Sequence, residues 1–198
     1  MTGVIREAVE RDLVAVKRMT DENIGKDFYT LSYLKKILKH ENEHLYIYAD
    51  AQDTAVAYLY FLEMDIDDAM EFLHIPDGML RFSPDMRVGI YKTACTEKEW
   101  QRKGILTLFL NKMEQVLEQR ALQCILFTAL QKPDGTVPVH KAVTAMNFLP
   151  VGTLKQPWIH THAYCPYCKM EYCVCDAVVY IKERKNITKN EDVTKKPE

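Results

Sequence analysis

The stretch Thr93–Gln119 reads TACTEKEWQRKGILTLFLNKMEQVLEQ and sets the interpretation of this chain. It predicts the end of a strand, a short basic turn with one glycine, and then an amphipathic helix. The N–H groups of a first helical turn have no partner within the helix, and the helix dipole adds partial positive charge there. Arg102 and Lys103 would add whole charges, and Gly104 would let a ligand approach the backbone closely. We therefore predict a phosphate-binding turn, with an ordinary loop-to-helix turn and a solvated basic face as the alternative. The apolar stripe of the helix is Leu106, Leu110, Met113 and Leu117.

Composition is that of an ordinary globular protein. The 198 residues are 47% hydrophobic and 27% charged. The formal net charge is −2, so the chain lacks the general excess of positive charge that is typical of nucleic-acid-binding proteins. No apolar run is long enough to span a bilayer, and the N-terminus lacks a signal-like apolar region. We expect one domain over residues 1–182, a disordered polar tail over 183–198, no nucleic-acid or membrane partner, and a cytoplasmic location. The oligomeric state is left open, a homodimer included.

Hydrophobic periodicity and turn residues predict the order of elements along the chain. The predicted strands are 4–10 (with its turn), a hairpin of 45–49 and 55–64, then 87–96, 124–129, 149–158 and 176–182. The strand 149–158 is expected to be interrupted near Pro157. The predicted helices are 12–26, 31–39, 101–120 and 139–146. Residues 65–85 read as a loop with one helical turn.

Two short motifs resemble one known family. Gln101-Arg102-Lys103-Gly104-Ile105-Leu106 is similar to the pyrophosphate loop Gln/Arg-x-x-Gly-x-Gly/Ala of the GNAT acetyltransferases, although Leu106 stands where the family usually has Gly or Ala. The stretch 147–152, NFLPVG, resembles the Gly-Phe-x-x-x-Gly segment that often opens the sixth strand of that family. The element order also matches, over roughly Val4 to Lys182.

The resemblance implies a fold, a reaction and a cofactor. The fold is α/β (α+β), a mixed central sheet of about six to seven strands flanked by about four helices. The reaction is acetyl-CoA-dependent N-acetylation of a primary amine, on a small molecule or a peptide, by direct attack. Pantetheine would lie where strand 87–96 splays from strand 124–129 and would pair with the backbone of Ala94 and Thr96. The pyrophosphate site would comprise Gln101 and the N–H groups of Arg102, Lys103, Gly104, Ile105 and Leu106.

Catalytic candidates follow from the same resemblance. The family's thiolate acid is usually a tyrosine at the position of Val143, which carries no proton to donate. His140, on the same helix, is the candidate acid, and a water is the other candidate. A solvated histidine at a helix start is the alternative reading of His140. Glu63 and Tyr91 are candidate bases. Strand alternation places Tyr91 and Cys95 on one face, and Cys95 would allow a covalent acetyl-cysteine route.

Four cysteines crowd near the C-terminus in the pattern C-x2-C-x4-C-x-C: Cys165, Cys168, Cys173 and Cys175. Thiolates are the soft ligands that zinc prefers, so the pattern favours a structural Zn²⁺ with no open coordination position. Simply reduced cysteines, or a redox CxxC pair, are the alternatives. His160 and His162 are close enough in sequence to replace a ligand or to line a substrate entrance.

Other function classes stay open at this point. A catalytically weak CoA-binding module and a zinc-stapled interaction module fit the same sequence, because Val143 and Leu106 depart from the family pattern. An acidic stretch would attract a cationic acceptor if it is not simply a solvated loop. Its members are Glu63, Asp65, Asp67, Asp68 and Glu71.

Overall fold

The computed structural model describes residues 3–160 and 164–184, which form a seven-stranded mixed sheet in the order β1-β2-β3-β4-β5-β7-β6. The strands are β1 (Val4–Glu7), β2 (Glu43–Ala49), β3 (Ala55–Asp65), β4 (Arg87–Thr96), β5 (Cys124–Gln131), β6 (Leu149–Leu154) and β7 (Asp176–Glu183). The α-helices of the described residues are α1 (Leu13–Asn23), α2 (Leu31–Ile37), α3 (Ile66–Phe72), α4 (Ile105–Gln119) and α5 (His140–Ala145).

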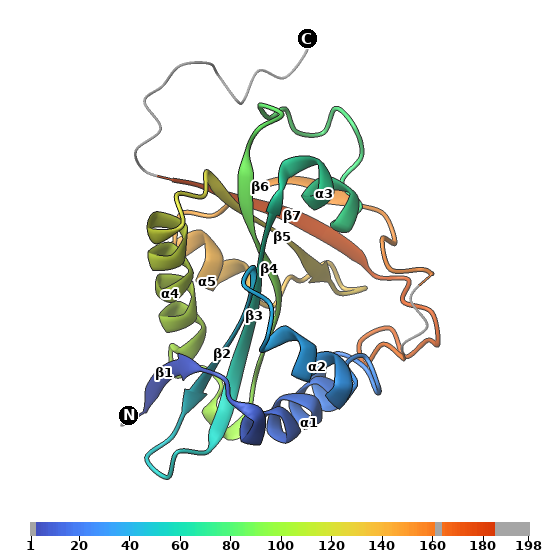
Figure 1. Ribbon diagram of the computed structural model, residues 1–198. Helices are drawn as coiled ribbons and strands as arrows, with labels where there is room; N and C mark the ends of the chain where they lie inside the picture. Colours follow the sequence, from blue (N-terminus) through green and yellow to red (C-terminus); the bar gives the residue numbers. More distant parts are fainter. Residues whose placement is uncertain (1–2, 161–163, 185–198) are drawn as a thin grey trace.

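Helices cover both faces of the sheet (Figure 1). One core cluster packs α1, α2 and α3 against one face, and a second packs α4 and α5 against the other. The buried residues of α4 recur with helical spacing, as expected for one apolar stripe. They are Ile105, Phe109, Leu110, Met113, Val116 and Leu117.

Several predicted boundaries differ from the structure. The predicted helix 101–120 begins at Ile105, and the predicted helix 12–26 ends at Asn23. The loop 65–85 contains a helix of seven residues, α3. The predicted strand 149–158 ends at Leu154, because Gln156 adopts a left-handed φ of 46° immediately before Pro157. The last strand extends to Glu183, so the first residue of the predicted tail belongs to the sheet; residues 185–198 lie outside the described residues.

A bulge in β4 changes which side chains share a face. Tyr60 pairs with Thr93 and Phe61 pairs with Tyr91, which leaves Lys92 as the extra residue. An extra residue inverts the alternation beyond it. Tyr91 consequently packs in the α4-side core, whereas Cys95 packs in the α1-side core. The prediction that Tyr91 and Cys95 share a face is therefore wrong.

The parallel strands β4 and β5 pair at only three positions, from Val88–Cys124 to Ile90–Leu126. Both strands continue beyond that point, β4 to Thr96 and β5 to Gln131. Their carboxyl-terminal arms therefore diverge, which confirms the predicted splay. No helix in the described residues is long and apolar enough to cross a membrane.

Candidate functional site

The turn that follows β4 presents backbone donors and positive charge. Gly104 has a φ of +79°, and a Cβ built on it would meet nothing within 4 Å. The first helical hydrogen bond of α4 runs from the N–H of Leu108 to the carbonyl of Gly104, at 3.2 Å. Within the described part of the chain, the N–H groups of residues 105–107 make no backbone hydrogen bond. Arg102 and Lys103 are exposed beside them, so the turn has the donors and charges that a phosphate requires.

The side chains of Gln101 and Leu106 anchor this turn to the rest of the protein. The Nε2 atom of Gln101 donates to the carbonyl of Thr96 at 3.1 Å, which ties the turn to the end of β4. Leu106 is half-buried and packs against the α4-side core. The Leu106 side chain therefore contributes to helix packing and does not fill the space over Gly104.

The two backbone partners predicted for pantetheine lie on the diverging arm of β4. Ala94 and Thr96 pair with β3, and neither has a partner in β5. The carbonyl of Thr96 already accepts the bond from Gln101. Ala94 is half-buried against the α4-side core. The edge of β4 that faces β5 is thus without a strand partner at these positions, as an extended ligand would need.

An aromatic row crosses the α4 side of the sheet and ends at His140. The ring centroid of Phe127 is 4.8 Å from that of Tyr91 and 5.0 Å from that of Tyr180. The Nδ1 atom of His140 lies 2.7 Å from the phenolic oxygen of Tyr180. Burial raises the pKa of both tyrosines, so their phenols stay protonated at neutral pH. The structure thus brings His140 and Tyr91 into one row.

Tyr180 was not singled out from the sequence. The only signal available was an aromatic residue at alternating position in a predicted buried strand. Val143, where the family has its tyrosine, is fully buried in the α4-side core. The hydroxyl group that contacts His140 therefore comes from β7, and position 143 of α5 supplies none.

Glu63 lies apart from this row. Its side chain is completely buried and contacts His44 (Nε2–Oε1, 2.6 Å), Arg120 (Nε–Oε1, 3.2 Å) and Arg87 (NH2–Oε2, 3.7 Å). Arg120 follows the last residue of α4, whereas the phosphate turn precedes its first residue. A helix of fifteen residues rises about 22 Å. Glu63 is therefore part of a buried ion network at the opposite end of α4 from the candidate site.

Lys92, the bulge residue, is enclosed by aromatic rings on the α1 side. Its ammonium lies 5.0–5.7 Å from the ring centroids of Tyr29, Tyr33, Tyr60 and Phe72. It also donates to the Tyr33 hydroxyl at 3.0 Å. These rings come from the α1–α2 loop, α2, β3 and α3, so Lys92 joins all of them to the bulge. A charged residue inside a predicted strand was the only sequence signal for this arrangement.

The acidic stretch does not form one surface. Glu63 is buried on the α4 side, and the Asp65 carboxylate lies 3.8 Å from Nε of Arg87. Asp67, Asp68 and Glu71 are exposed on α3. Three of the five carboxylates thus face solvent on one helix beside the aromatic enclosure of Lys92.

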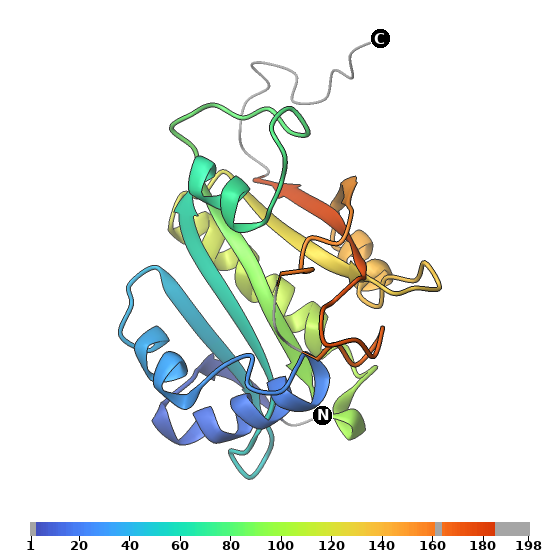
Figure 2. The same ribbon diagram turned by 90° about the vertical axis from the view of Figure 1, so that its right-hand side faces the viewer.

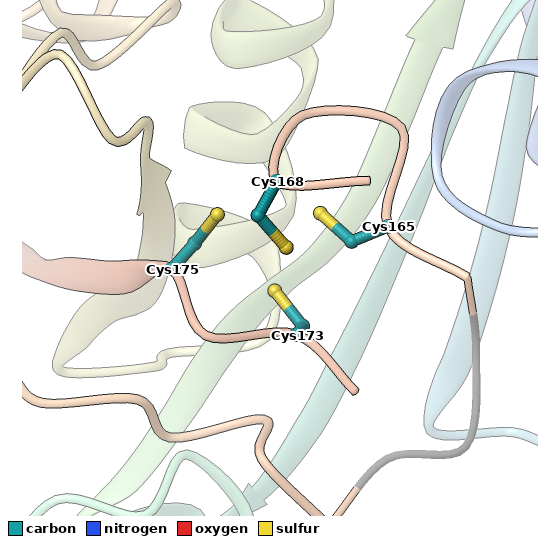
Figure 3. Close-up of side chains that lie close together, drawn as sticks. All are labelled: Cys165, Cys168, Cys173 and Cys175. Atoms are coloured by element: carbon teal, nitrogen blue, oxygen red, sulfur yellow. The ribbon is translucent and has the colours of Figure 1, made fainter. Parts of the chain in front are cut away.

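The four cysteines converge (Figure 3). The sulfur atoms of Cys165, Cys168, Cys173 and Cys175 all lie within 4.8 Å of one another. We call residues 165–175 the cysteine knuckle. Four sulfurs at about 2.3 Å from one zinc ion are about 3.8 Å apart in a tetrahedron, so a small contraction would complete a metal site. His160 is exposed and is not among the grouped ligands, and His162 lies outside the described residues.

Backbone geometry supports the convergence of the knuckle. Lys169 has a left-handed φ of 58°, its N–H donates to the carbonyl of Cys165, and the Cys165 N–H donates to the carbonyl of Met170. Burial acts to raise the pKa of Cys168, but the backbone N–H groups of Val174 and Met170 bond to its sulfur and lower the pKa overall. Backbone donors aimed at the Cys168 sulfur stabilise its thiolate, whereas burial raises the pKa of the Cys173 thiol to about 11.

No protein-family model matches the chain, and no curated protein matches it. Solved structures do match its fold. Arabidopsis thaliana NAA60 in complex with acetyl-CoA aligns with a TM-score of 0.69 and 10% identity, over 92% of this chain and 98% of the other. This chain has the GNAT fold. The Escherichia coli ribosomal-protein-S18-alanine N-acetyltransferase aligns with a TM-score of 0.62 and 11% identity, over 96% and 99%.

A third match with the GNAT fold is the NatC complex bound to Gag peptide and CoA. It has a TM-score of 0.66 and 11% identity, and covers 92% of this chain and 99% of the other. The predicted mixed α/β architecture is confirmed, with seven strands and five α-helices among the described residues. At 10–11% identity the likeness concerns the fold, and the chemistry must be argued from the residues of this chain.

Proposed function

We propose that this protein is an acetyl-CoA-dependent N-acetyltransferase that acts on a primary amine of a small molecule or peptide. The observation that carries the proposal is the divergence of β4 and β5 directly before the phosphate turn. The free edge of β4 suits pantetheine, and the open N–H groups of residues 105–107, with Arg102 and Lys103, suit the pyrophosphate. The GNAT fold of acetyl-CoA-bound and CoA-bound proteins supports this placement.

Direct attack would proceed as follows with the residues of this chain. The neutral amine forms a bond to the thioester carbonyl carbon, the carbonyl oxygen gains negative charge, and the nitrogen loses one proton to solvent water. Collapse then breaks the carbon–sulfur bond and releases the CoA thiolate. Backbone N–H groups on the free edge of β4 would stabilise the oxyanion. A protonated Tyr180 donating to Nδ1 leaves the neutral His140 ring with its proton on Nε2. That proton would be available to the departing thiolate.

The two candidate bases, Glu63 and Tyr91, lie in different environments. Glu63 is engaged by three cationic or polar partners at the other end of α4 and is no longer proposed as a base. Tyr91 is buried beside Phe127 with a raised pKa, which favours hydrogen-bond donation over proton abstraction. We therefore propose Tyr91 as a donor in the aromatic row. The Cys95 thiol lies on the opposite face, and burial raises its pKa to about 11, which disfavours a covalent acetyl-cysteine route.

We further propose that the cysteine knuckle holds one structural Zn²⁺. The four sulfurs satisfy its preferred ligand number and softness. The ion would cross-link a segment between β6 and β7 whose described residues carry no helix or strand.

Calorimetric titration of the zinc-replete protein with acetyl-CoA tests the transferase proposal. We expect micromolar binding in the wild type, and a loss of at least about a hundredfold in Arg102→Glu/Lys103→Glu, because two charge-assisted contacts become repulsive. Lys26→Glu changes the net charge at an exposed site outside the turn and should bind normally.

The same proteins are then screened for acetylation of peptide and small-molecule amines. Turnover in the wild type supports the transferase. Acetyl-CoA binding without turnover of any amine would favour the CoA-binding module, and no binding at millimolar acetyl-CoA would overturn the proposal.

A further inference from the structure

Lys92 carries a half-buried ammonium group that has no carboxylate partner among the residues that the structure describes. Its Nζ atom lies 5.0–5.7 Å from four ring centroids and donates to the hydroxyl of Tyr33 at 3.0 Å. An ammonium group has three N–H donors. The other two donors of Lys92 make no hydrogen bond within the described part of the chain, so they can serve a ligand.

Two phenols fix the direction of the hydrogen bonds behind Lys92. The Tyr60 hydroxyl donates to a carboxylate oxygen of Glu43, and the hydroxyl oxygens of Tyr33 and Tyr60 are 3.1 Å apart. Because a phenol has only one proton, Tyr60 accepts from Tyr33, and Tyr33 accepts from Lys92. Burial raises the pKa of Tyr60, so this phenol keeps its proton at neutral pH. The chain therefore ends in donors at Lys92, and a ligand bound there must bring an acceptor atom.

The aromatic enclosure holds this ammonium in one place. Tyr29 and Tyr60 are buried, and the Tyr29 and Tyr33 rings stack with centroids 5.4 Å apart. Ring faces attract a cation without neutralising its charge. A fixed and partly dehydrated ammonium loses little conformational entropy when it binds an anion, and it attracts that anion more strongly than it would in bulk water. The enclosure thus prepares Lys92 to bind a negatively charged oxygen.

Lys92 lies near the closed end of the β4–β5 splay. The last pair between these strands is Ile90–Leu126, so Lys92 is only two positions into the unpaired arm of β4. Under the proposed function, pantetheine that starts at the phosphate turn and passes Thr96 and Ala94 brings the acetyl group toward this end. The Lys92 side chain is enclosed on the α1 side, and Figure 2 views the face that carries α1, α2 and α3, with α4 behind the sheet. An amine that approaches from this face would meet the ammonium of Lys92.

The charges on this face suit a ligand with both signs of charge. Asp67, Asp68 and Glu71 are exposed on α3, whose Phe72 supplies one of the four rings around Lys92. These carboxylates would attract the ammonium form of an incoming amine, whereas Lys92 would attract a carboxylate. An acceptor with cationic groups alone would bring a like charge toward Lys92. A zwitterion meets both requirements.

We propose that the acceptor is an amine that also carries a carboxylate, as a free amino acid does, and that Lys92 determines this specificity by binding the carboxylate. The inference rests on the proposed function for the transfer reaction. It narrows the acceptor from primary amines in general to amino acids. The contact between Lys92 and the carboxylate does not itself require turnover.

Competition between matched acceptors measures the contribution of the carboxylate. Phenylalanine is mixed in equal amounts with phenethylamine, and leucine with isoamylamine, so that the members of each pair differ only by the carboxylate. The acetylated products are quantified by mass spectrometry, and their ratio gives the ratio of the two kcat/KM values, whatever the amount of folded enzyme. In the wild type, we expect the amino acid to be favoured at least about tenfold in at least one pair, because it forms a charge-assisted bond to Lys92.

Variants of Lys92 decide the origin of that preference, because the two amines of a pair also differ in basicity. Lys92→Met keeps the apolar stem without the charge and should lower the product ratio at least about tenfold. Lys92→Arg keeps the charge and should retain most of the preference. Lys112→Met is the matched control, because the Lys112 ammonium lies 5.3 Å from the Tyr46 ring on the opposite face of the sheet. Its product ratio should equal that of the wild type.

Calorimetry with the acetylated products provides a readout without turnover. For at least one pair, the wild type should bind the N-acetyl amino acid about tenfold more tightly than the N-acetyl amine, and Lys92→Met should remove that difference. If no amine is acetylated, the proposed function fails, but product binding that depends on both the carboxylate and Lys92 would still support the site.

Two results would overturn the inference while the proposed function stands. One is acetylation in which Lys92→Met leaves every product ratio as in the wild type. The other is a wild-type preference for the carboxylate-free amine in both pairs.

Discussion

The imidazole of His140 is bonded to the hydroxyl of Tyr180, with Nδ1 and the phenolic oxygen 2.7 Å apart. His140 is exposed at the start of α5, whereas Tyr180 is fully buried in β7. A side chain from the interior therefore sets the orientation of a surface histidine. Because Tyr180 also stacks on Phe127, this orientation is tied to β5, one arm of the splay.

Tyr180→Phe keeps His140 but removes the hydrogen bond that orients its ring. Loss of one hydrogen bond at a partly buried pair should lower the free energy of unfolding by about 1 kcal/mol. Calorimetry should show unchanged acetyl-CoA affinity, and kcat should fall with an altered pH–rate profile, because the ring is no longer held in one tautomer. Tyr164→Phe, at an exposed position, serves as the control. An unchanged kcat and pH–rate profile would show that His140 takes no part in proton transfer.

Leu106→Ala tests whether the leucine crowds the phosphate turn or packs the helix. The side chain is half-buried in the α4-side core, so truncation should cost about 1–2 kcal/mol of unfolding free energy, below the usual value for a fully buried leucine. The dissociation constant for acetyl-CoA should not change. Leu108→Ala, on the exposed side of α4, should affect neither quantity. A tenfold gain in affinity for Leu106→Ala would instead show that the leucine obstructs the cofactor.

Glu63→Gln tests a structural against a catalytic role. Neutralising this buried carboxylate leaves Arg120 and Arg87 without their buried partner, and because both arginines are half-exposed we expect a loss of about 2–3 kcal/mol. Chemical denaturation measures that loss. Asp65→Asn, an exposed neighbour of Arg87, should cost less than about 1 kcal/mol. A stable Glu63→Gln variant with abolished turnover would contradict the structural assignment.

Local sequence was sufficient for the glycine turn before α4 and for the convergence of the four cysteines. Gly104 adopts the left-handed backbone that glycine favours, and α4 begins immediately after it. The C-x2-C-x4-C-x-C spacing predicted that four sulfurs could meet, and they do. In both cases the residues that form the feature lie within a few positions of one another, so chain geometry alone brings them together.

The faces of β4 could not be read from alternation, because alternation assumes that every residue is paired. The register shift opposite Tyr60 and Phe61 leaves Lys92 unpaired and moves Tyr91 and Cys95 to different sides of the sheet. The aromatic enclosure of Lys92 stabilises that bulge, and its rings come from four separate elements. No pattern within the strand carries that information.

By itself, the sequence determined the element order apart from α3, the glycine turn before α4 and the spacing of the four cysteines, because each depends on propensities and contacts between near neighbours. Only the tertiary structure decided that Glu63 joins Arg120 and His44, that the hydroxyl of Tyr180 contacts His140, and that the Tyr167 ring lies 5.2 Å from the ammonium of Lys132. These relationships join residues that are far apart in the chain. Strand order, register and the divergence of β4 from β5 bring them into contact.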